Sequence, residues 1–423
     1  MLAVLFAICV CRSVADDIPQ GWTASNMEAI GYSDLEGRGG AFKMAIKEVN
    51  GRWYLYLGHL WNRGWSIVEV TEPASPRYVK FVPWPQDNTS TKQVDLHDNL
   101  LLTGLQGIPE AWGGVKGKRF DEGLLLWDIS DPVNPKLLSH WKTGAGQSPK
   151  AGTHRNVYPG GKYAYLAAGM PGFRGDQQIL VILDVSDPKN PKEAGRWWMP
   201  GQKDDEPHAR RINFHGAPVV DGNMAYMAYG PGIVILDISD VSRPKVIGQI
   251  MTSPLFKRDL HSVLLLPNKM LFASNEAVEE SCDASLSLAA LFDVKDPRNP
   301  QMVANLPIPV PPKDTGYRDF CEKGGRFGPH NTNSEYHLPA VQPQGKLIYL
   351  TYFNAGLRVF DIENPRIPKE VAWFIPPQPT KRLGPQPTTK LVTQTEDVLV
   401  DRRGNIYITD KQWGLFVLRS KLP

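Results

Sequence analysis

Four histidines recur at one position of a pattern that repeats along the chain. Three of them stand nine residues before a short apolar run begins: His154, His215 and His261. The same count from Ile406 arrives at Asp397, whereas in the preceding unit a longer connection makes the count slip. There His330 takes the matching position, with His337 as the competing choice. Imidazole binds iron, copper, nickel and zinc, so the spacing predicts a metal site if the units bring these side chains together.

We expect four imidazoles to bind one transition metal ion: His154, His215, His261 and His330. Asp397 would ligate the ion or orient a ligand. Fe(II) is the favoured ion, with copper, manganese and zinc as alternatives. Glu276, at the end of a predicted strand, is placed to hold the second ring nitrogen of a ligand histidine. The competing interpretation is a water-filled channel, in which the same side chains bond water or a neighbouring backbone.

One recurring phrase identifies the elements that would position these side chains. It occupies residues 66–73, 125–132, 181–188, 234–240, 290–297 and 358–365, with a clipped copy at 414–418. Each copy is a β-branched and aromatic run that ends in Asp-x-Ser-Asp-Pro or an equivalent. Asp and Ser bond nearby backbone amides and Pro cannot donate to a continuing ladder, so the strand stops there. The copies lie roughly 50 to 70 residues apart, the range of propeller blades.

A hairpin precedes each copy and a short strand follows it, which makes four strands per unit. We therefore predict an all-β fold, a seven-bladed β-propeller, as a single domain over residues 16–423. The innermost strands would begin at one mouth of the central channel and bring the histidines together on the axis. The last unit lacks an outer strand, and an N-terminal strand within Trp22 to Tyr32 is expected to supply it and close the ring.

The repeated phrases resemble the LVIVD repeat family. The segment Gly328-Pro329-His330-Asn331, with residues 351–361 after it, resembles that family closely. The resemblance covers nearly the whole chain and implies a β-propeller outside the cytosol, without a defined reaction. Carotenoid-cleaving oxygenases, with a four-histidine iron site, and copper-dependent thiol oxidases related to selenium-binding proteins share the propeller layout. They are analogies of layout and not of sequence.

The N-terminus and the cysteines indicate export. Residues 1–15 are predicted to be a signal peptide, because Leu2 to Val10 is a short apolar run with small residues behind it, although a positive start is missing. Its removal leaves two cysteines, which we expect to form one disulfide between Cys282 and Cys321. Two unpaired thiols are the alternative. The protein is expected to be secreted or periplasmic, and no other stretch is apolar enough to span a membrane.

Long connections at the histidine mouth are expected to form a substrate pocket. Their aromatic and guanidinium groups provide the candidate lining: Arg155, Arg211, Arg258, Trp112 and Phe173. Such a wall suits a small aromatic or carboxylate-bearing molecule. The alternative is a solvated positive rim.

Composition excludes some functions and leaves three. A net charge of +3 without a Lys/Arg-rich run argues against a nucleic acid partner. Hydrolase and phosphate-loop motifs are absent, and no catalytic residue is assigned. The leading hypothesis is a non-haem iron oxidoreductase that acts on a small organic substrate. The alternatives are a non-catalytic binding propeller for a protein, glycan or surface ligand, and a metal-dependent lyase or hydrolase.

Overall fold

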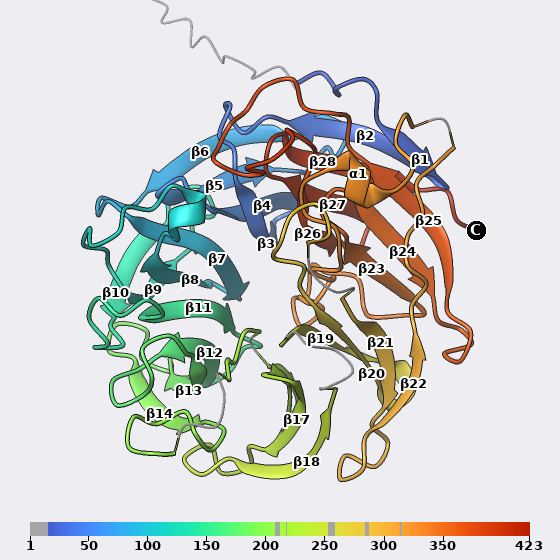
Figure 1. The fold of residues 1–423 in the computed structure, drawn as a ribbon. Helices are drawn as coiled ribbons and strands as arrows, with labels where there is room; N and C mark the ends of the chain where they lie inside the picture. Colours follow the sequence, from blue (N-terminus) through green and yellow to red (C-terminus); the bar gives the residue numbers. More distant parts are fainter. Residues whose placement is uncertain (1–15, 208–211, 217, 253–258, 284–286, 314) are drawn as a thin grey trace, which may run out of the picture.

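The fold is a ring of antiparallel sheets around a central axis (Figure 1). The structure, a computed structural model, describes residues 16–207, 212–216, 218–252, 259–283, 287–313 and 315–423. These residues form 28 strands, the short helix α1 (Phe320–Lys323) and the 3₁₀ turns η1 (Glu110–Trp112) and η2 (Pro267–Lys269). None of their helices is long and apolar enough to cross a membrane. The predicted signal peptide, residues 1–15, lies outside the described part of the chain.

Neighbouring strands of a sheet follow one another in sequence, except where the N-terminal strands join the last two sheets and where the two halves of an eight-stranded sheet meet. The first sheet contains β3 (Ala41–Val49), β4 (Arg52–His59), β5 (Gly64–Glu69) and β6 (Arg77–Pro83). An eight-stranded sheet follows, and its first half contains β7 (Thr89–His97), β8 (Leu100–Gly107), β9 (Gly123–Asp128) and β10 (Lys136–Trp141). Its second half contains β11 (Gly152–Val157), β12 (Tyr163–Gly169), β13 (Ile179–Asp184) and β14 (Lys192–Trp197). The two halves meet where Gly152 pairs with Gln106.

Two more four-stranded sheets continue the ring. One contains β15 (Val219–Asp221), β16 (Met224–Tyr229), β17 (Gly232–Asp237) and β18 (Lys245–Met251). The other contains β19 (Leu260–Leu266), β20 (Met270–Asn275), β21 (Ala289–Asp293) and β22 (Gln301–Asn305). In Figure 1, β3, β7, β11 and β19 lie toward the middle of the ring, and β6, β10, β14, β18 and β22 lie at its rim.

The N-terminal segment completes the last two sheets. One sheet contains β23 (Leu347–Thr351), β24 (Leu357–Asp361), β25 (Lys369–Ile375) and β1 (Thr23–Ser25). The other contains β26 (Thr395–Val400), β27 (Asn405–Asp410), β28 (Gly414–Ser420) and β2 (Met27–Ser33). Because Tyr32 pairs with Phe416, β2 is the predicted outer strand of the last sheet. The predicted segment also supplies β1, the outer strand of the preceding sheet, where Thr23 pairs with Ile375.

The repeated phrase forms the turn predicted for it. The Asp that ends the buried strand accepts a hydrogen bond from the backbone N–H two residues later at Asp128, Asp184, Asp237, Asp293 and Asp361. This bond uses a backbone N–H that would otherwise pair with the neighbouring strand, so the strand ends there. Apolar side chains on the faces of neighbouring sheets pack together, as where Leu180 and Ile182 meet Met227 and Val234. The all-β propeller is therefore confirmed, and its inner strands open onto a shared channel.

Candidate metal centre

Three inner strands around the channel carry an extra residue near their start. The pairing register shifts around His154 in β11, around His261 in β19 and around Glu396 in β26. Such a β-bulge places two residues opposite one and re-aims a side chain. The bulges explain how residues at one register, far apart in sequence, come to share one site.

The four predicted histidines form one contiguous arc. Ring centroids lie 4.4 Å apart for His154 and His215, 4.5 Å for His215 and His261, and 4.8 Å for His261 and His330. His337 is not part of the arc, because its Nε2 lies 3.2 Å from Asp95 Oδ1. Of the two candidates in this unit, His330 and not His337 therefore lies in the arc.

Glu276 was expected to hold the second ring nitrogen of a ligand histidine, but it lies at the centre of this arc and faces the Nε2 atoms. Its Oε2 is 3.7 Å from His215 Nε2 and 3.6 Å from His261 Nε2, and its Oε1 is 3.7 Å from His330 Nε2. These contacts are too long to be hydrogen bonds. Ligand atoms that bind one ion at about 2.0–2.2 Å stand roughly 3.0–3.5 Å from one another. The spacing thus fits a group of ligands around a shared ion better than it fits direct bonds between side chains.

Hydrogen bonds on the far ring nitrogen fix the tautomer of three histidines. Nδ1 of His154 donates to Gln106 Oε1 at 3.0 Å, and Nδ1 of His330 donates to the Glu396 carbonyl at 2.8 Å. Nδ1 of His261 donates to Ser262 Oγ at 2.7 Å, because that hydroxyl itself donates to the His330 carbonyl. Each Nε2 therefore keeps its lone pair. Metal-bound histidines are oriented by this kind of partner.

Arg326 pairs with Glu276 on the side away from His215. Its guanidinium bonds the Glu276 carboxylate and donates to the Ala277 carbonyl at 2.5 Å. Burial alone would raise the pKa of Glu276, but the Arg326 guanidinium is the main cause that holds that pKa well below its usual value. The centre therefore contains a fixed carboxylate anion.

Burial keeps the imidazoles neutral. It is the main cause that lowers the pKa of all four well below the usual 6.5, with neighbouring cations and imidazoles adding to the effect. A neutral imidazole is the form that binds a metal. The arc therefore offers up to four nitrogen ligands and one carboxylate, and this residue set fits a transition metal ion.

Asp397 does not lie with the imidazoles. Its carboxylate lies 3.1 Å from Lys43 Nζ and accepts the Met44 N–H at 2.9 Å. Burial raises the pKa of Asp397 to about 6 although Lys43 opposes the shift. The count that selected it began at the apolar Ile406, whereas the hydrogen-bonded strand begins one residue earlier. The residue at the histidine register is Glu396.

Glu396 and Lys411 were missed by the sequence analysis. Glu396 Oε2 lies 3.3 Å from His330 Nδ1, and Glu396 Oε1 lies 2.7 Å from Lys411 Nζ. Both side chains are buried. A count from the first strand residue, Asn405, would have found Glu396, but no local pattern marks Lys411 or Arg326.

The predicted pocket residues divide into separate groups. Trp112 lies near the arc, since Lys92 Nζ stands 4.8 Å from its ring centroid and 3.5 Å from His154 Nδ1. Phe173 packs on Trp198 in a surface pocket that contains no histidine of the arc. Arg155 lines a cavity in the channel. Arg211 and Arg258 lie outside the described residues.

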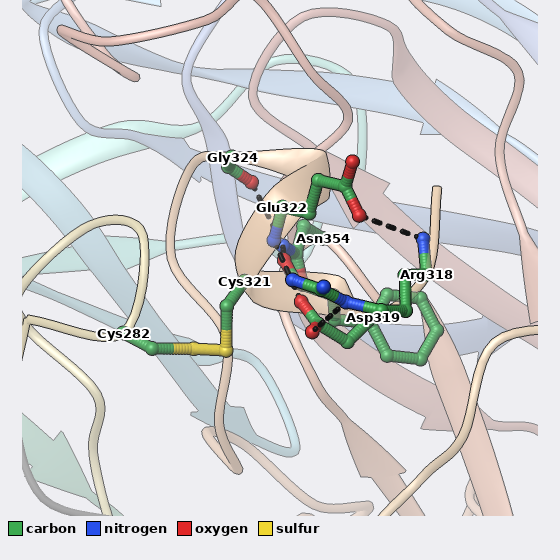
Figure 2. Close-up of a disulfide and its surroundings, with 8 residues drawn as sticks. Cys282, Arg318, Asp319, Cys321, Glu322, Gly324 and Asn354 are labelled. Carbon is green, nitrogen blue, oxygen red and sulfur yellow. Dashed lines mark hydrogen bonds and ion pairs between the residues drawn. A yellow bond between two sulfur atoms is a disulfide. The ribbon is translucent and has the colours of Figure 1, made fainter. Parts of the chain in front are cut away.

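The predicted disulfide joins the two segments that carry Glu276 and Arg326. Cys282 follows Glu276 in the β20–β21 connection, and Cys321 lies in α1, with a Cα–Cα distance of 5.3 Å between them (Figure 2). Asn354 anchors the helix by donating to the carbonyls of Phe320 and Gly324. The bridge therefore joins the same two segments as the Arg326–Glu276 ion pair. A disulfide is compatible with an extracellular or periplasmic location.

Comparison with known proteins finds a repeat family and propeller structures that resemble this chain. The LVIVD repeat model matches residues 119–143, 151–198 and 219–252. The periplasmic gluconolactonase PpgL of Pseudomonas aeruginosa is 10% identical over 86% of this chain and 94% of its own, with a TM-score of 0.54. The β-propeller domain of Cps50 from Myceliophteria thermophila is 10% identical over 90% of this chain and 96% of its own, with a TM-score of 0.49. No curated protein matches the sequence significantly.

Proposed function

This chain is a β-propeller that carries LVIVD repeats, and we propose that it is an exported metalloprotein with one transition metal ion in its channel. The ligands would be Glu276 and the four imidazoles of the arc: His154, His215, His261 and His330. We also propose that the ring has seven blades, with the eight-stranded sheet counted as two. The disulfide supports export, since such bonds persist in oxidising compartments.

The three fixed tautomers carry this proposal. His154, His261 and His330 each use Nδ1–H on a protein acceptor and keep an Nε2 lone pair. A channel that merely holds water places no such demand on several imidazoles at once. Nor does it require a carboxylate within 3.7 Å of three Nε2 atoms.

The donor set favours Fe(II) and an oxidoreductase. Imidazole nitrogen with carboxylate oxygen, and no thiolate, suits iron, whereas copper, manganese and zinc are alternatives. Bound Fe(II) would supply one-electron chemistry with dioxygen for the oxidation of a small organic substrate. The role of Arg326 is to hold Glu276 ionised and in place. The role of Ser262, Gln106 and the Glu396 carbonyl is to hold the imidazoles in their ligand form.

Anaerobic metal titration tests the proposal. The full chain is treated with a chelator, exchanged into buffer and titrated separately with Fe(II), Cu(II), Mn(II) and Zn(II), followed by oxygen uptake with a panel of small aromatic and carboxylic compounds. We expect one Fe(II) per chain and uptake of oxygen in the presence of substrate. Binding of a metal without oxygen uptake would favour the lyase or hydrolase, in which the metal polarises water. Failure to bind any metal would replace the enzyme by a binding propeller.

A further inference from the structure

The cavity that Arg155 lines lies in the channel beyond the imidazoles. The residues that line it follow the arc along the inner strands, on the side of the β11–β12 turn, and include Arg155, Val157, Pro159 and Ser262. It has a volume of about 50 Å³ and contains no histidine of the arc in its lining. A water needs about 10–15 Å³ on this measure, so the cavity has room for a ligand of roughly four heavy atoms.

Arg155 is the charged group of this cavity that lacks an ionic partner. Its Nη1 lies 3.4 Å from Ser262 Oγ, and among the described residues no carboxylate forms an ion pair with it. Gly216 lies beside it, and a Cβ there would make an ordinary contact of 3.6 Å with Arg155 Nη1 but would clash with the His261 carbonyl at 2.4 Å. Five N–H donors on a fixed fork are suited to a carboxylate.

Lys43 is the other cation of this lining, and two carboxylates share it, while Asp95 and Glu335 also line the cavity. Lys43 pairs with Glu335 and, at 3.1 Å, with Asp397. His337 lies 3.2 Å from Asp95. A guanidinium removed from water is costly unless it is paired. Arg155 is therefore the group to which a further anion would bind.

We propose that this cavity binds a small monocarboxylate on the Arg155 guanidinium, and that the ligand arrives from the face of the β11–β12 turn. The inference rests on the proposed function in one respect, since the carboxylate would be that of the substrate. Ser262 connects the two sites, because its Oγ bonds His261 Nδ1 at 2.7 Å and lies 3.4 Å from Arg155 Nη1. A carboxylate on Arg155 would therefore lie one side chain, Ser262, away from His261.

Acetate is the probe that tests this site, because its four heavy atoms match the cavity. Binding of sodium acetate is measured by calorimetry at constant ionic strength with chloride as the reference anion. The protein is the full chain, as purified and after chelator treatment. Arg155→Met removes the charge and Arg155→Lys keeps it without the fork. Arg52→Met is the control, because Arg52 is an exposed arginine that pairs with Glu69 at 2.8 Å.

We expect acetate to bind both forms of the wild type, with at least a tenfold loss of affinity in Arg155→Met, a smaller loss in Arg155→Lys and no change in Arg52→Met. Unchanged binding in Arg155→Met, or no binding to the wild type, would overturn the proposal. Acetate that binds only the metal-loaded form would be a ligand of the metal, which overturns the Arg155 site and leaves the proposed function standing. Binding through Arg155 by a protein that takes up none of the four metals in the titration would support this site and reject the proposed function.

Discussion

Nε2 of His261 and Oε2 of Glu276 face each other at 3.6 Å, and one hairpin produces this contact. Leu260 of β19 pairs with Asn275 of β20, so the residues that follow each of them reach the same end of the hairpin. The bulge at His261 then turns its imidazole toward the carboxylate. A single supersecondary unit thus supplies an imidazole and the only anion at the centre of the described arc.

Glu276→Gln should remove the metal. The substitution keeps the shape of the side chain and deletes the anion, so we expect at least a tenfold loss of metal affinity. Arg326 would then be left buried without its partner, which costs about 3–5 kcal/mol of the free energy of unfolding. Metal stoichiometry and urea unfolding measure the two effects. Glu280→Gln, in the same connection but bonded to Thr388 and Thr389, is the control that should keep the metal.

Ser262→Ala should weaken metal binding without emptying the site. The hydroxyl accepts the Nδ1 proton of His261, and removal of such a partner typically costs about 10–100-fold in metal affinity. Competition with a chromophoric chelator measures the change. Ser274→Ala is a matched control, because Ser274 pairs directly with Ser262 in the hairpin and its buried Oγ has no hydrogen-bond partner. Equal losses in the two variants would show that the effect is one of packing.

His337→Gln should destabilise the protein at low pH and leave its metal in place. Burial would lower the pKa of His337, but the Asp95 carboxylate outweighs it and raises that pKa. A raised pKa in the folded state gives stability that is full below about 6.5, the unfolded value, and is lost as pH rises through the folded value. We expect the free energy of unfolding to fall by about 1.5–3 kcal/mol at pH 6, which is typical of a hydrogen bond to a charged group, and by less at pH 9. An equal loss at both pH values would contradict the ion pair.

Replacing both cysteines by serine should lower the free energy of unfolding by about 2–4 kcal/mol. Because Cys282 and Cys321 lie on the segments that carry Glu276 and Arg326, the metal should also dissociate faster from the double variant. Urea unfolding and the rate of metal loss to a chelator measure these effects. Two free thiols in folded, unreduced protein would show that the bridge does not form.

The fold could be predicted from the sequence because its signal is local and repeated. The strand that ends at Asp184, with the Asp184–Ser186 bond that stops it, recurs with the same chemistry around the ring. The closing strand followed from an incomplete last unit. The pairing of β1 with β25 left no such trace, since three residues at a sheet edge have no pattern of their own.

The site was predictable only where side chain and register coincide. The histidines were found because they recur at one count before the strand that follows, whereas the carboxylate at that register was assigned to Asp397 instead of Glu396. Strand starts are set by backbone pairing and not by polarity, so the polar Asn405 was not counted. The central place of Glu276 and its contact with Arg326 depend on how loops from different sheets meet, which a single sequence does not encode locally.

Metal stoichiometry of the purified protein tests the central claim most directly. The chain is produced without a histidine tag or chelator, and elemental analysis is made on the wild type and on alanine variants of His154, His215, His261, His330 and His337. The account predicts about one transition metal ion per wild-type chain, a sharp loss in each of the first four variants and none in His337→Ala. A wild type without metal, or full metal in all four variants of the arc, would contradict it.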